Sequence, residues 1–87
     1  MQTEQLQIDQ LRREATITIA SLSRKVSRGN SCGDGFGRVW TILEALPLAT
    51  EEFCRLRNHL QNAEDYARAD ERGGARYELA LLARSIG

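Results

Sequence analysis

The sequence has few cysteines, one proline and no long hydrophobic run. Its two cysteines, Cys32 and Cys54, are fewer than the disulfide frameworks of small secreted domains contain. No apolar run approaches the ~20 residues that a membrane-spanning helix needs. The polar start, residues 1–5, lacks the basic-then-apolar order of a signal peptide. We therefore expect a cytoplasmic protein with reduced thiols and no membrane partner.

Neither sign of charge is in excess. Twelve Lys and Arg residues balance twelve Asp and Glu residues, so the net charge is zero. This argues against a dominant electrostatic attraction to nucleic acid or to anionic membranes, although a local patch remains compatible with it. A neutral surface also gives little colloidal repulsion, which favours self-association.

Length and composition indicate a single small folded domain over residues 1–87. Hydrophobic residues make up 41% and charged residues 28%, proportions typical of a globular chain. A domain of this length buries only about 60% of the surface of its unfolded chain. Such domains often gain stability from a partner or a second copy.

Apolar residues recur every three or four positions, which is the spacing of one helix face. In the first segment, about 2–28, these are Ile8, Leu11, Ala15, Ile19, Leu22 and Val26. In a short second segment they are Phe36, Val39, Trp40, Leu43 and Leu46. In a third, about 50–72, they are Phe53, Leu56, Leu60, Ala63 and Ala67, and in a fourth they are Ala75, Leu79, Leu82 and Ile86. We predict an all-α bundle of about four helices, with a Gly-rich loop after the first.

An alternative fold rests on residues Ala15–Ala20, Ala-Thr-Ile-Thr-Ile-Ala, which alternate with period two and contain β-branched side chains. This pattern is typical of a strand. Paired with Arg38–Leu43, the segment would form a short hairpin in an α+β fold.

Breaks between helices are predicted at three places. Gly29–Gly37 contains four glycines, which predicts a surface loop. Pro47 should stop the second helix near Leu46, because the residue before proline avoids the α region. Thr50 is the expected N-cap of the third helix, and Gly73-Gly74 is the expected connection to the fourth.

Two groups of residues suggest chemistry but lack the spacing that it needs. The Gly29–Gly37 loop resembles a phosphate cradle only in its glycine content, since neither phosphate-binding glycine motif is present. Cys32, Cys54 and His59 lack the paired spacing of zinc ligands. Cys54 and His59, five residues apart, also fall on different helix faces. We expect a connector loop, no metal or cofactor, and no catalytic residues.

A basic cluster supports one functional alternative. Arg24, Lys25 and Arg28 lie near the end of the first helix, and Arg38 follows the loop. Such residues can contact phosphates, so a small nucleic-acid-binding regulator is possible. No aromatic residues interleave with the cluster, and a solvated face or helix-end charge is the preferred interpretation of it.

The preferred hypothesis is a non-enzymatic interaction or adaptor module that self-associates. Leu79–Ala83 is an unbroken apolar run, more than one core-facing stripe requires. Either that helix is buried on most sides, or part of it faces a partner. The interface candidates are Trp40, Tyr77, Leu81 and Leu82.

Overall fold

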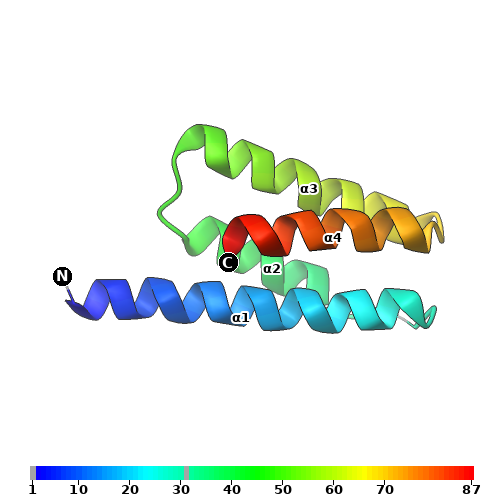
Figure 1. Ribbon diagram of the computed structural model, residues 1–87, viewed down its shortest axis with the longest axis horizontal. Coiled ribbons are helices and arrows are strands. Elements are labelled where there is room, and N and C mark those ends of the chain that lie inside the picture. Colours follow the sequence, from blue (N-terminus) through cyan, green and yellow to red (C-terminus); the bar gives the residue numbers. More distant parts are fainter. Residues whose placement is uncertain (1, 31) are drawn as a thin grey trace.

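The computed structural model describes residues 2–30 and 32–87, and four helices account for most of them (Figure 1). They are α1 (Gln2–Ser27), α2 (Gly35–Ala45), α3 (Thr50–Arg68) and α4 (Arg72–Ile86). The predicted all-α fold is confirmed. The α+β alternative is wrong, because Ala15–Ala20 lies inside α1 and Arg38–Leu43 inside α2. Tertiary burial follows the 3.6-residue period there: Ala15 and Ile19 are buried whereas Ile17 is exposed.

Each helix runs antiparallel to the one before it (Figure 1). α4 packs along both α3 and α1, and α2 packs on α1 and α3. The 26 residues of α1 span about 39 Å, nearly the 43 Å long axis of the molecule. Near its middle, Arg12 Nη1 donates a hydrogen bond to the carbonyl oxygen of Ile86 at 2.9 Å. The turns of α1 before Arg12 therefore extend past the end of α4.

The core lies between the four helices and consists of the predicted apolar stripes. Its largest fully buried side chains are Leu22, Val39, Leu43, Leu56, Leu60, Leu79, Leu82 and Ile86. Every helix contributes at least one of them, so each helix is held by burial of an apolar face rather than by its own propensity. Trp40 and Phe53 pack at the margin of this core.

The connection between α3 and α4 differs from the prediction. α3 ends at Arg68, and Gly73-Gly74 lies in the first turn of α4 rather than between the helices. Asp70 adopts a φ of 58° instead, and Glu71 N donates to Tyr66 O at 2.8 Å. This is the Schellman arrangement, in which Asp replaces the usual glycine. The α1 terminus closes in the same way, with Gly29 at φ 71° and a bond from Asn30 N to Lys25 O.

The starts of α2 and α3 also differ from the prediction. α2 begins at Gly35, so the last part of the predicted Gly29–Gly37 loop is helical. A side chain at Gly35 would collide with Leu22, which explains the glycine there as a packing requirement of the α1–α2 contact. The N-cap of α3 is Ala49, and Thr50 is the first helical residue. The predicted Thr50 cap is therefore wrong by one position.

Candidate interaction surface

A concave surface lies between α1 and α2, with a volume of about 870 Å³. Its floor contains Leu11 and Ile42, and its rim contains Ile17. Ile42 is only 8% exposed, whereas Ile17 is 66% exposed. We call this surface, together with its continuation described next, the α1–α2 groove.

The groove continues along α1 toward the first turn of α2. This part is lined by Ile17, Thr18, Ser21, Leu22, Lys25, Asp34, Gly35 and Arg38. The α1 residues in this lining are mostly three or four positions apart, so they share a face of that helix and form one side of the groove. Glu14 lies toward one end of the lining and Lys25 at the other. Along α1 the lining thus changes from a negative charge at Glu14 to a positive charge at Lys25, while Asp34 and Arg38 line both parts of the groove.

The structure brings together two of the four basic residues singled out from the sequence. Lys25 and Arg38 line the same part of the groove. Arg24 and Arg28 are exposed at the end of α1 but do not line it. In the part of the chain that the structure describes, none of these four side chains forms an ion pair. Their charge is therefore available to a partner.

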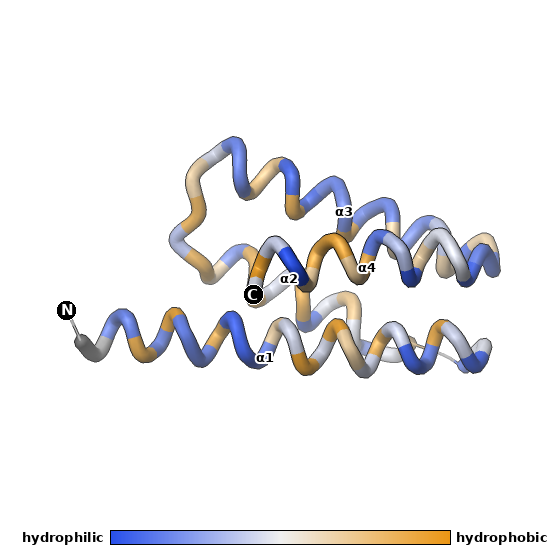
Figure 2. The backbone as a smooth tube through the Cα atoms, viewed as in Figure 1, coloured by the Kyte–Doolittle hydropathy of each residue, from blue (hydrophilic) through white to orange (hydrophobic). Residues whose placement is uncertain are grey.

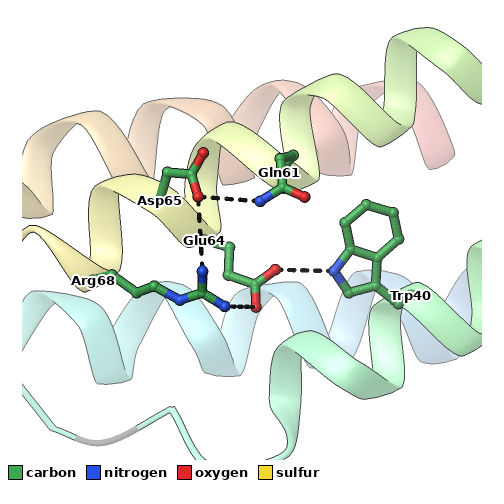
Figure 3. A network of polar contacts seen from close by, with 5 residues as sticks. All are labelled: Trp40, Gln61, Glu64, Asp65 and Arg68. Atoms are coloured by element: carbon green, nitrogen blue, oxygen red, sulfur yellow. Dashed lines mark hydrogen bonds and ion pairs between the residues drawn. The ribbon is translucent and has the colours of Figure 1, made fainter.

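Trp40, an interface candidate, is held between α2 and α3 (Figure 3). Its Nε1 donates to Glu64 Oε1 at 3.0 Å, and Arg68 Nη2 donates to Glu64 Oε2 at 3.0 Å. The half-buried indole packs against the core cluster. Trp40 thus joins two helices of its own chain, which leaves only part of its ring for a partner.

The other three interface candidates lie on α4 and separate into core and surface. Leu82 is 0% exposed and packs among the buried residues of the bundle, so its selection as an interface residue is corrected. Tyr77 is 65% exposed, and Leu81, one turn later, is half-buried. These two form a smaller apolar surface on the outer side of α4. Figure 2 shows hydrophobic positions recurring along α1 and concentrated in the second half of α4.

Ile17 and Leu6 were not selected from the sequence, yet both are exposed apolar side chains of α1. Leu6 is 68% exposed and Ile17 is 66% exposed. Ile17 belongs to the Ala15–Ala20 segment, whose alternation favours a strand. On a helix of 3.6 residues per turn, both lie roughly opposite the stripe of Ala15, Ile19 and Leu22. Their position off that stripe was the feature of the sequence that indicated their exposure.

The remaining titratable candidates do not converge. His59 Nδ1 lies 2.6 Å from Glu78 Oε2 and joins α3 to α4, whereas Cys54 is exposed on another face of α3. Burial raises the pKa of the Cys32 thiol, and the charge of Lys25 opposes that rise. In residues 2–30 and 32–87, no three His, Cys, Asp or Glu side chains are grouped as a metal site would require.

Among the described helices, none combines the length and the apolar character needed to cross a bilayer. No family model, curated protein or solved structure matches the chain.

Proposed function

We propose that this protein is a non-enzymatic interaction or adaptor module of the cytoplasm that self-associates through the α1–α2 groove. The observation that carries the proposal is Ile17, an isoleucine 66% exposed on the rim of a groove whose floor contains Leu11 and Ile42. Burying such a side chain fully contributes about 1.5–3 kcal/mol. A partner helix lying in the groove would cover all three residues.

A binding role also suits the way in which the polar side chains are used. The Trp40–Glu64 and His59–Glu78 contacts each join two helices of the bundle. These groups hold the fold together instead of facing the groove. The groove itself presents apolar side chains and charges of both signs, which suits recognition of another protein surface.

The test compares two exposed surfaces by measuring mass in solution. Light scattering across a range of concentrations should show a dimer for the natural sequence. Ile17→Glu should weaken association by at least about tenfold, since a charge replaces a buried apolar contact. Leu81→Glu is the matched variant on α4 and should leave the association unchanged.

Circular dichroism of both variants checks that the helices remain. A natural chain that stays monomeric at every concentration would refute self-association. Loss of the dimer in Leu81→Glu alone would move the interface to the outer side of α4, where Tyr77 and Leu81 lie.

A second candidate function, phosphate-backbone binding by a nucleic-acid regulator, rests on a separate observation. Arg24, Lys25, Arg28 and Arg38 lie at one end of the α1–α2 pair without ion-pair partners among the described residues. Binding of duplex DNA at low salt, lost in Arg24→Glu and weakened by added salt, would support it. Absence of binding at low salt would exclude it.

A further inference from the structure

We infer that the occupant of the α1–α2 groove is a second copy of this chain, packed with its α1 antiparallel, so that Glu14 of each copy faces Lys25 of the other. This inference rests on the proposed self-association and specifies its geometry. A two-fold interface uses the same surface twice, so every contact between two different positions occurs twice. The groove must then be complementary to itself when its direction is reversed.

The charges along the α1 side of the groove meet that condition. Glu14 and Lys25 both line it and both are exposed. They are eleven residues apart on one helix, about 16 Å along its axis. Reversing a second α1 against the first places each glutamate opposite the partner's lysine. A parallel arrangement would instead place like charges together.

The middle of this arrangement has side chains that allow close approach. The point halfway between positions 14 and 25 lies between Ile19 and Ala20. The groove-lining residues nearest to it are Thr18 and Ser21, which are small and uncharged. Two helices related by a two-fold axis there meet without like-charge repulsion. Position 17 of each copy is then level with position 22 of the other, next to Ser21, and Ile17 loses contact with water.

The surroundings of Lys25 strengthen the attraction for a carboxylate. Arg38 lines the same part of the groove, and Arg24 lies next to Lys25 in the sequence. Asp34 is the acidic residue on this part of the lining, so two basic side chains face one acidic side chain. Glu14 forms no ion pair among the described residues. The pairing between copies therefore uses charges that the monomer leaves unpaired.

Charge reversal tests the geometry, because each single variant should dimerise weakly by itself whereas a mixture of the two should form a heterodimer. Glu14→Lys places lysine against lysine twice, and Lys25→Glu places glutamate against glutamate twice. Each variant alone should dimerise at least about tenfold more weakly than the natural chain, since two attractions become two repulsions. An equimolar mixture should recover a heterodimer, because both contacts are again Glu–Lys. The double variant Glu14→Lys/Lys25→Glu should also dimerise.

Two control variants carry the same charge changes outside the groove. Asp9→Lys on α1 and Arg76→Glu on α4 alter exposed residues that do not line it. Both should dimerise as the natural chain does. Circular dichroism and thermal unfolding of every variant establish that the helices persist, as the exposure of Glu14 and Lys25 predicts.

The outcomes separate this inference from the proposed function. If the natural chain dimerises and both charge reversals leave its dissociation constant unchanged, the antiparallel geometry is wrong while self-association stands. If both reversals weaken the dimer but their mixture does not recover it, the Glu14–Lys25 pairing is wrong. If the natural chain is monomeric at all concentrations, both statements fail. Duplex DNA binding lost in Lys25→Glu would then assign the basic end to nucleic acid.

Discussion

The guanidinium group of Arg72, at the start of α4, lies against the backbone of Gly29, at the end of α1. A Cβ atom on residue 29 would be 2.6 Å from Arg72 Nη2. Arg72 Nε also donates to Asp70 Oδ1 at 3.1 Å, so the arginine links two Schellman turns at one end of the bundle. Gly29 and Asp70 are the residues with positive φ in those turns.

This contact predicts that substitutions at Gly29 and Arg72 are coupled. Gly29→Ala should lower the free energy of unfolding by about 1–2 kcal/mol, because alanine is strained at a φ of 71°. It should also displace Arg72. In an Arg72→Ala background the same substitution should therefore cost about 0.5 kcal/mol less. Urea unfolding of the four proteins measures the coupling, and strictly additive effects would contradict it.

The two glycines at the start of α2 should respond to alanine in opposite directions. A Cβ at Gly35 would lie 2.4 Å from Leu22 Cδ2, whereas a Cβ at Gly37 meets open space. Leu22 is buried and cannot move freely. Gly35→Ala should therefore destabilise by about 1–3 kcal/mol.

Gly37→Ala serves as the matched control two residues away. It should stabilise by about 0.5–1 kcal/mol, since glycine is less favourable than alanine within a helix. Thermal unfolding should place the two midpoints on opposite sides of that of the natural chain. A loss of stability in Gly37→Ala would contradict the open environment.

Leu81 and Leu82 are adjacent in the sequence but differ in what covers them. Leu82 is fully buried, and Leu81 is half-buried on the outer side of α4. Leu82→Ala should lower the free energy of unfolding by about 2–5 kcal/mol through loss of apolar contacts and formation of a cavity. Leu81→Ala should cost less than about 1 kcal/mol. Equal losses in denaturant unfolding would contradict this division between core and surface.

The Cys32 thiol should be less reactive than the exposed Cys54 thiol. It should also make the free energy of unfolding depend on pH in the alkaline range. Burial raises the pKa of Cys32, so the folded state holds the thiol proton more tightly than the unfolded state does. At pH 8 a maleimide should therefore modify Cys54 first, as mass spectrometry of the singly labelled protein would show.

The sign of the stability change follows from proton binding. The pKa of Cys32 is higher in the folded state than in the unfolded state. Its contribution to the free energy of unfolding is therefore present below the unfolded thiol pKa, about 8.5, and is lost as pH rises through the folded pKa. The free energy of unfolding should fall more steeply between pH 8 and 10 in the natural chain than in Cys32→Ala. Identical slopes in the two proteins would show that Cys32 is not the group responsible.

The helices could be predicted from the sequence because their apolar residues follow one period over long segments. Ala15, Ile19 and Leu22 predicted a buried face of α1, and that face is buried. Local chemistry was less informative at the helix ends. The sequence predicts Gly73-Gly74 as the connection, but Asp70 adopts the left-handed conformation and the glycines are part of α4. Helix termini depend on a few weak local preferences that packing of the neighbouring helix can override.

The sequence by itself determined that this chain forms amphipathic helices, because a 3.6-residue repeat of apolar side chains leaves one face to be buried. Only the tertiary structure decided which side chains remain outside. Of the apolar side chains off those repeats, Ile17 stays 66% exposed whereas Leu81 is half-buried, a difference set by the helices packed against α1 and α4. The groove is likewise a product of packing: Glu14, Lys25 and Arg38 share it because α2 folds back along α1.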